Sequence, residues 1–208
     1  MTRYAALCLV AGTLACHGKA DAPLSPQGFI GTELTAPVSK PSATFTDSRG
    51  LPFRFDSATH DKVVLVFFGY TNCPDICPVH LANLAAVLDK MPDSVQTHVA
   101  VVFITTDPAR DTPAVLDKWV HGFDPGFIGL TASDSVIAAA QRDAGEVATV
   151  KGAPDATGAY PVGHAAQVIA YTRDGVGRVA YAPGTRQRDW AHDLPLLVAF
   201  PQPQAPSH

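Results

Sequence analysis

The length, composition and charge of the chain predict one folded domain and exclude several classes of protein. It has 208 residues, of which 47% are hydrophobic and 16% charged, a composition that supports one apolar core and excludes a disordered chain. The formal net charge is -4 at pH 7, and no long cluster of lysine and arginine is present. We therefore expect no nucleic-acid partner, because a protein that follows the phosphate backbone needs such a cluster.

The first 15 residues have the layout of an export signal. Arg3 is followed by an apolar run ending at Ala15, which is too short to span a bilayer and is typical of a secretory signal peptide. The run ends on Leu14, Ala15 and Cys16, which resembles a bacterial lipoprotein signal, in which the cysteine becomes the lipidated first residue. We expect an exported protein on the periplasmic face, anchored to the membrane through a lipid on Cys16. Cleavage at about residues 20–22, giving a plain secreted protein, is the alternative.

A flexible tether is predicted between this signal and the folded domain. Residues 16–40 are rich in proline, glycine, alanine and serine and show no periodicity. The domain is expected over residues 41–200, and residues 201–208 are expected to form a disordered tail. Its first element should be a β-hairpin, with strands at residues 43–46 and 52–55 joined by a turn that contains glycine.

The rest of the domain alternates strands and helices. A continuous β-branched and aromatic run at residues 62–69 is typical of a strand buried on both faces in the middle of a sheet. The elements predicted after it are helix 78–91, strand 97–104, helix 112–119, strand 127–130, helix 133–144, a hairpin at 167–171 and 176–181, and a closing helix at 187–200. This order predicts an α/β fold, with a central mixed sheet flanked by helices and a β-hairpin at its N-terminus.

Two cysteines inside the domain point to chemistry. A disulfide between Cys73 and Cys77 would close a very short loop and contribute little stability. At the expected start of a helix, this spacing places both sulfurs on one face, where the helix dipole and free amides lower thiol pKa values and favour thiolates. Thiolates bind soft metals, and two sulfurs leave Cu(I) undercoordinated. A nitrogen ligand from elsewhere in the chain is therefore expected.

Eight histidines could supply that nitrogen, and their positions distinguish them. Most fall in the tether, in the tail, at the opposite end of the sheet or on flanking helices. His80 lies three residues after Cys77 and could approach the site along the same helix. His164 lies in a loop before a predicted strand and could fold across the two cysteines. The residues alone leave both histidines as candidates.

Two motifs of the chain resemble the Sco/SenC family of copper-site assembly proteins. They are FGYTNCPDICP at residues 68–78 and TDPARDTP at residues 106–113, and the resemblance extends from about residue 37 to residue 200. It implies a thioredoxin-like fold and a copper ion, as Cu(I) or Cu(II), bound by Cys73, Cys77 and His164. It also implies a role in maturing the dinuclear copper centre of cytochrome c oxidase. The implied partners are the copper-binding subunit of that oxidase and an upstream copper donor or thiol reductant.

The chain departs from the family pattern beside His164. Members of the family often have aspartate before this histidine and hydroxyl residues after it, where this chain has Gly163, Ala165 and Ala166. A carboxylate commonly orients a ligand imidazole, so its loss predicts that His164 is less constrained and that copper affinity is affected.

Three acidic residues lie near the predicted site. Asp107 and Asp111 follow the second buried strand, at the same sheet edge as the cysteines, where they could form a docking patch or support the metal ligands. A cap on the next helix, formed by residues 111–113, is an equally good interpretation. Asp75 lies between the cysteines and could contact a partner or simply be solvated.

The principal alternative is an enzyme, a thiol–disulfide oxidoreductase that reduces the copper-ligand cysteines of the oxidase. Cys73 and Cys77 would be its redox pair, because residues four apart can form a disulfide. Dithiol reductases of this fold typically have two residues between their cysteines, whereas three residues here open the pair for a metal. A thiol peroxidase is a weaker alternative, because the chain lacks the Thr-x-x-Cys-Thr motif of such enzymes. A structural zinc site is weaker still, because a closed site needs four protein ligands and three are found. We therefore expect mainly a metal carrier.

Overall fold

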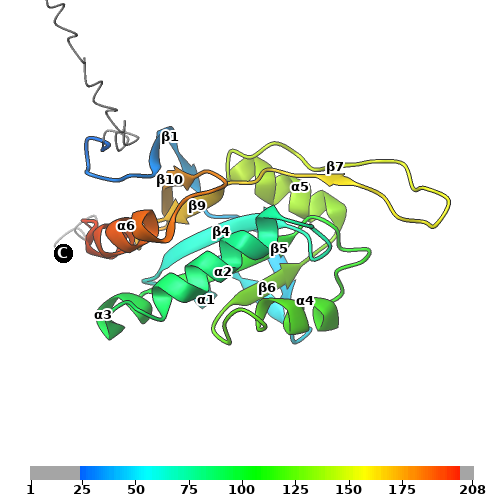
Figure 1. Cartoon of the computed structure of the whole chain (residues 1–208), viewed down its shortest axis with the longest axis horizontal. Coiled ribbons are helices and arrows are strands. Elements are labelled where there is room, and N and C mark those ends of the chain that lie inside the picture. Colours follow the sequence, from blue (N-terminus) through cyan, green and yellow to red (C-terminus); the bar gives the residue numbers. More distant parts are fainter. Residues whose placement is uncertain (1–23, 202–208) are drawn as a thin grey trace, which may run out of the picture.

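The computed structural model describes residues 24–201. The predicted signal peptide, Cys16 and all but the first residue of the predicted tail therefore lie outside the described part of the chain. Within residues 24–201, one eight-stranded sheet carries helices on both faces (Figure 1). This arrangement confirms the predicted α/β class. No helix in this part of the chain is long and apolar enough to cross a membrane.

The elements agree with most of the predicted ranges. The main sheet contains β1 (Thr32–Ser39), β2 (Thr44–Asp47), β3 (Pro52–Arg54), β4 (Val63–Gly69), β5 (Val99–Thr105), β6 (Ile128–Thr131), β9 (Val168–Tyr171) and β10 (Val176–Tyr181). A separate two-stranded ribbon contains β7 (Val150–Lys151) and β8 (Val162–Gly163). The helices are α1 (Phe55–Ala58), α2 (Ile76–Leu88), α3 (Asp93–Gln96), α4 (Pro113–Val120), α5 (Asp134–Asp143) and α6 (Gln187–Ala199). The two predicted hairpins, β2–β3 and β9–β10, are confirmed.

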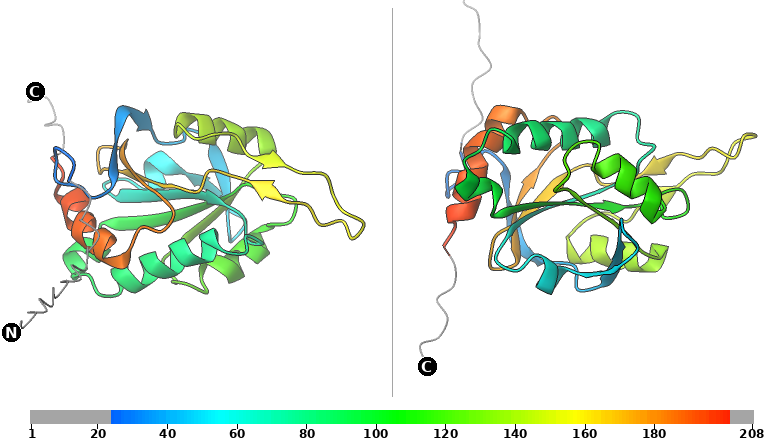
Figure 2. Two further views of the ribbon diagram at one scale, coloured as in Figure 1. Left: turned by 45° about the horizontal axis from the view of Figure 1, so that its top comes forward. Right: turned by 90° about the horizontal axis from the view of Figure 1, so that it is seen from below.

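Strand β4 lies inside the sheet, whose order is β1-β10-β9-β4-β5-β6-β2-β3. It pairs in parallel with β5 and antiparallel with β9, and all of its residues are buried. Val63, Leu65 and Phe67 pack in one core with α2, α4 and α6, while the residues between them pack in a second core with α5 and the β2–β3 hairpin. Figure 2 shows the sheet between the helices that cover its two faces. Because strand side chains alternate between faces, burial on both sides requires the continuous apolar run.

The prediction of a tether over residues 16–40 is wrong for its second half. Strand β1 pairs antiparallel with β10 and extends the sheet. Just before it, Phe29 is buried in the core beside α6. The backbone N–H groups of Ile30 and Gly31 donate to the carboxylate of Asp193 on α6, at 3.0 and 2.9 Å. These contacts join residues far apart in the sequence, so local composition could not reveal them.

The carboxyl ends of the parallel strands form the edge at which the predicted site residues gather. Strands β4, β5 and β6 run parallel, and the loops after β4 and β5 carry the cysteine motif and the TDPARDTP motif. The ribbon β7–β8, which the sequence did not predict, projects from the body (Figure 1). We call residues 150–163 the arm. His164 follows the arm directly, so the arm brings this side chain to the sheet edge.

Asp193→Ala is expected to lower the free energy of unfolding by about 3 kcal/mol. The carboxylate is fully buried and accepts from Ile30, Gly31 and the Tyr181 hydroxyl, so alanine would leave buried donors unpaired. Urea titration measures the change. The matched control Asp143→Ala removes an exposed helical carboxylate and should change the free energy by less than about 0.5 kcal/mol. Equal effects of the two substitutions would contradict the role of Asp193.

Candidate metal centre

Two sulfurs and one imidazole meet beyond the carboxyl end of β4. One ligand atom from each of Cys73, Cys77 and His164 lies within 4.8 Å of the others, and among residues 24–201 no other group of this kind is found. The Cys77 Sγ atom lies 3.7 Å from His164 Nε2. Two thiols and an imidazole form a donor set suited to a soft or borderline metal ion. The tertiary structure therefore brings together the three predicted ligands, although Cys77 and His164 are 87 residues apart in the sequence.

The two cysteines reach the site from different local structures. Cys77 is the second residue of α2 and is fully buried. Cys73 lies in the loop before α2, half-buried, and its backbone N–H donates to the Tyr70 carbonyl at 3.1 Å in a turn. The prediction that both cysteines share one helix face is therefore wrong for Cys73. A turn, rather than helical spacing, places its sulfur near that of Cys77.

Burial controls the protonation of Cys77. Desolvation raises the pKa of the Cys77 thiol well above its usual range, and the neighbouring Cys73 thiol adds to this rise against the opposing hydrogen bond from the Tyr70 backbone. The expectation of a lowered thiol pKa is therefore wrong for Cys77. The N-terminal turn of a helix favours a thiolate, but here the cost of removing the anion from water is larger. A bound cation would reverse this balance, so metal binding must release the thiol proton.

His164 is oriented by the backbone and by two aromatic rings. Its Nδ1 lies 2.7 Å from the Ala165 carbonyl oxygen, which can only accept, so the proton belongs on Nδ1 and Nε2 presents its lone pair to the sulfurs. The Tyr70 and Phe67 rings meet the imidazole edge-on, with centroids 5.5 and 6.1 Å away. A carbonyl thus takes the place of the carboxylate that Gly163 lacks, and the imidazole is more constrained than the sequence predicted.

His80, the second candidate ligand, has a different partner. It is buried, and its Nε2 donates to the Ala166 carbonyl at 3.1 Å. Desolvation lowers its pKa against the opposing effect of the hydrogen bond to Ala166, and His164 adds a smaller lowering, so the ring stays neutral near pH 7. His80 therefore supports the backbone just after His164 and does not join the three ligand atoms.

Both aspartates after β5 point inward. Asp107 and Asp111 are fully buried, so the prediction of an acidic docking patch is wrong. Asp111 accepts from the Thr71 N–H at 2.9 Å, from the Thr71 hydroxyl at 2.5 Å and from the Thr105 hydroxyl at 2.6 Å. It thereby ties the cysteine loop to the end of β5. The cap of α4 is Thr112, whose side chain accepts from Val115 N–H.

The third aspartate differs from these two. Asp75 is exposed at the N-cap position of α2, and its side chain makes no capping hydrogen bond there. Its carboxylate is therefore available to solvent or to a partner, as the sequence allowed.

The sequence did not reveal the importance of Gly69, which it marked only as the end of a strand. A Cβ atom on Gly69 would lie 2.6 Å from Cys77 Sγ and 2.7 Å from the Phe103 ring. The absence of a side chain therefore lets the sulfur approach the strand end. A glycine directly between a buried strand and a cysteine motif is the signal that could have found it. Arg110 and Tyr160, discussed below, were also missed.

Comparison with known proteins identifies similar chains. The family model of SCO1/SenC matches residues 35–199. The mitochondrial SCO2 homolog of Mus musculus is 35% identical over 144 residues, which are 68% of this chain and 55% of that protein. The matches to the first curated relatives span from 24% to 55% of the lengths of those proteins.

Solved structures share the fold. The apo Sco1 protein of Thermus thermophilus is 34% identical, with a TM-score of 0.73 over 81% of this chain and 96% of that chain. Bradyrhizobium japonicum ScoI, solved with copper bound, is 31% identical, with a TM-score of 0.65 over 77% of this chain and 96% of that chain. The predicted thioredoxin-like fold is confirmed by these Sco structures.

Gly69→Ala is expected to displace the Cys77 sulfur and to lower the free energy of unfolding by about 1–3 kcal/mol, because the added methyl overpacks a rigid strand end. Urea titration of the reduced, metal-free protein measures the change. Gly163→Ala is the matched control, since a Cβ atom there meets nothing nearer than 3.8 Å. A Gly69→Ala variant as stable as the control would contradict the close approach.

The raised pKa of Cys77 predicts a pH dependence of stability in the reduced, metal-free protein. Below about pH 8.5, the ordinary thiol pKa, the folded and unfolded states both keep the proton. Above it the unfolded chain loses the proton while folded Cys77 keeps it, so the stability advantage of the folded state is lost as pH rises.

Cys77→Ala removes this contribution while other titrating groups cancel in the comparison. The difference in unfolding free energy between wild type and Cys77→Ala should therefore become less favourable to wild type from about pH 8 to about pH 10. Urea titrations at several pH values measure it. A difference that stays constant over this interval would show that the pKa of Cys77 is not raised.

Proposed function

Because the chain belongs to the SCO1/SenC family, we propose that it is a copper-binding metallochaperone that delivers copper to, or prepares, the dinuclear copper site of cytochrome c oxidase. The observation that carries the proposal is the meeting of Cys73, Cys77 and His164 ligand atoms within 4.8 Å. Two further findings support it. The Sco family consists of cytochrome c oxidase assembly proteins. The similar ScoI of Bradyrhizobium japonicum has copper bound in its solved structure.

The three ligands differ in exposure, and this difference suits a carrier. Cys77 is fully buried, whereas Cys73 and His164 are half-buried. The two sulfurs suit Cu(I), and the imidazole nitrogen adds a ligand that Cu(II) also accepts. Copper would enter and leave from the side of Cys73 and His164, where a ligand of the partner can replace them one at a time. Cys77 would be the last ligand to release it.

The partners and the location follow from the same proposal. The recipient is the copper-binding subunit of the oxidase, and an upstream copper donor or thiol reductant prepares the site. We place the protein on the periplasmic face of the membrane, held there by a lipid on Cys16. The apolar run before Cys16, outside the described residues, supports this placement.

Titration of the mature protein with Cu(I) and Cu(II) tests the metal site. Wild type should bind one copper, and its Cu(II) form should show thiolate charge-transfer absorption and nitrogen coupling in its electron paramagnetic resonance (EPR) spectrum. His164→Ala should lose the nitrogen coupling and weaken binding at least about tenfold, and Cys77→Ser should remove most binding. The control His121→Ala, which removes an exposed histidine at the C-terminal end of α4, should match wild type. Unchanged spectra in His164→Ala would remove His164 from the site.

The second candidate function is a thiol–disulfide oxidoreductase. It is supported by two free thiols within 4.8 Å, one of them half-buried and reachable by a substrate. A reductase should have a disulfide potential between about -270 and about -120 mV, the span of enzymes of this fold, and should turn over with a reductant. Its activity should survive His164→Ala. Loss of copper binding without loss of turnover in that variant would favour the reductase.

A further inference from the structure

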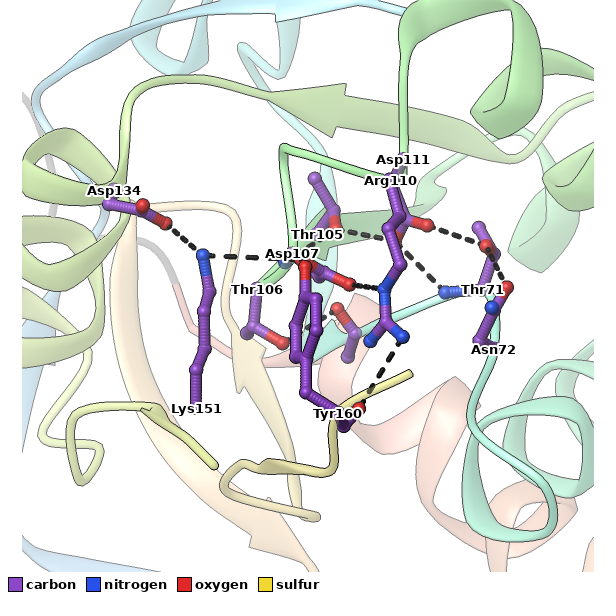
Figure 3. Close-up of polar contacts among 11 residues, drawn as sticks. Thr71, Asn72, Thr105, Thr106, Asp107, Arg110, Asp111, Asp134, Lys151 and Tyr160 are labelled. Atoms are coloured by element: carbon purple, nitrogen blue, oxygen red, sulfur yellow. Dashed lines mark hydrogen bonds and ion pairs between the residues drawn. The ribbon is translucent and has the colours of Figure 1, made fainter. Parts of the chain in front are cut away.

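The arm that leads to His164 is hydrogen-bonded to the rest of the domain at Asp107 (Figure 3). Asp107 follows β5, and its carboxylate is fully buried. The Tyr160 hydroxyl, on the arm, donates to Asp107 Oδ1 at 2.6 Å. On the body side, Arg110 forms an ion pair with the other carboxylate oxygen, and the Asp107 N–H donates to the Thr105 hydroxyl at 2.9 Å. The acceptor for Tyr160 is thus itself held in place.

Arg110 joins the arm to the rings that surround His164. Its guanidinium lies over the Tyr160 ring, 3.9 Å from the centroid, and its Nη1 donates to the Tyr160 carbonyl at 3.4 Å. The centroid of the Tyr70 ring lies 5.9 Å from the same guanidinium, and Tyr70 meets the His164 imidazole edge-on. Tyr160 is therefore held by its hydroxyl, its ring and its carbonyl, all through the segment that follows β5.

Apart from the buried side chain of Val162, the other contacts that hold the arm are more exposed. Strands β7 and β8 pair with each other in a sheet separate from the main one. Lys151 forms an ion pair with Asp134 on α5 at 2.6 Å, but the Asp134 side chain is 70% exposed, and such surface pairs contribute little. The Lys151 ammonium also lies 4.0 Å from Asp107 Oδ1, the oxygen that accepts from Tyr160. Between Tyr160 and His164 lies Gly163, which has no side chain to hold the backbone. The position of the imidazole therefore depends in part on where Tyr160 is fixed.

We propose that Asp107, Arg110 and Tyr160 form a clasp that positions His164 over the two cysteine sulfurs. The inference rests on the proposed copper site and adds positioning residues to it. The same short segment supports the other half of the centre, because Asp111 holds Thr71 in the cysteine loop. Residues 107–111 thus contact both the loop that carries the cysteines and the arm that leads to His164. The clasp is the set of contacts on the His164 side.

Tyr160→Phe tests the clasp, because it removes the hydroxyl and keeps the ring over Arg110. The variant should weaken copper binding about tenfold, as the loss of a partner that orients a ligand does, and should reduce or broaden the nitrogen coupling of the Cu(II) EPR spectrum. Tyr160→Ala, which also removes the stacked ring, should have a larger effect. In the metal-free protein, nuclear magnetic resonance (NMR) relaxation of the backbone amides of residues 160–166 should show increased mobility in both variants.

Tyr181→Phe is the matched control. It also removes a tyrosine hydroxyl that donates to a buried aspartate, Asp193, at 2.9 Å, but this hydrogen bond joins β10 to α6 and involves neither the arm nor any of the three candidate ligands. This control should lower stability and leave the copper affinity, the nitrogen coupling and the mobility of residues 160–166 at wild-type values. A structural role alone would make the two tyrosine variants behave alike in the spectra, which would overturn the clasp.

The outcomes separate this inference from the proposed function. If wild type binds copper through His164 and Tyr160→Ala keeps its affinity, nitrogen coupling and amide mobility, the clasp is overturned while the copper site stands. If wild type binds no copper, the proposed function fails, and the NMR comparison of the metal-free variants still decides whether Tyr160 holds the His164 segment. Unchanged mobility in that comparison also overturns the clasp.

Discussion

The burial of β4 on both faces is the constraint on which the metal centre depends. Its side chains supply both cores, so the strand cannot shift or rotate without exposing one of them. The point where the chain leaves the sheet, at Gly69, is therefore fixed. The cysteine motif begins at this point, and the sulfur of Cys77 packs against the glycine. The packed sheet in this way fixes the position of Cys77, one of the three candidate metal ligands.

Burial of this sulfur also sets the chemistry of the site. A buried thiol without a metal is most stable in its neutral form, which raises its pKa and makes it a poor nucleophile. A bound metal ion would supply a positive charge that stabilises the Cys77 thiolate in its buried position. Metal binding and release of the thiol proton are therefore coupled. Cys73, which is half-buried, is the thiol that a partner can reach first. This asymmetry suits stepwise ligand exchange better than a symmetrical pair would.

The candidate nitrogen ligand, His164, is positioned by different means. His164 follows an arm outside the main sheet, and several separate contacts determine where its ring lies. The Ala165 carbonyl sets the protonated nitrogen, His80 holds the Ala166 carbonyl, and the segment after β5 holds Tyr160. Several of these contacts use backbone carbonyls, which any residue supplies. The site can therefore accept glycine and alanine beside its histidine without losing the orientation of the ring.

The sequence by itself determined the class of fold and the identity of the candidate ligands. Period and composition over a few residues sufficed for β4, the two hairpins and the capped helices, because these features depend on local spacing and on burial of whole runs. The motif around Cys73 and Cys77 and the resemblance it carries pointed to a copper site and to His164. Local patterns of this kind are readable without knowledge of the rest of the chain.

Only the tertiary structure decided the features that depend on distant partners. Strand β1 was invisible in a segment of tether-like composition, because its partner is the distant strand β10 and the two residues just before it donate to Asp193 on α6. The direction of the Cys77 pKa shift depends on how deeply the sulfur is buried, which helix position alone does not reveal. The inward orientation of Asp107 was equally hidden, since its partner Tyr160 lies 53 residues away. Burial and long-range pairing are properties of the packed molecule, so no local pattern can specify them.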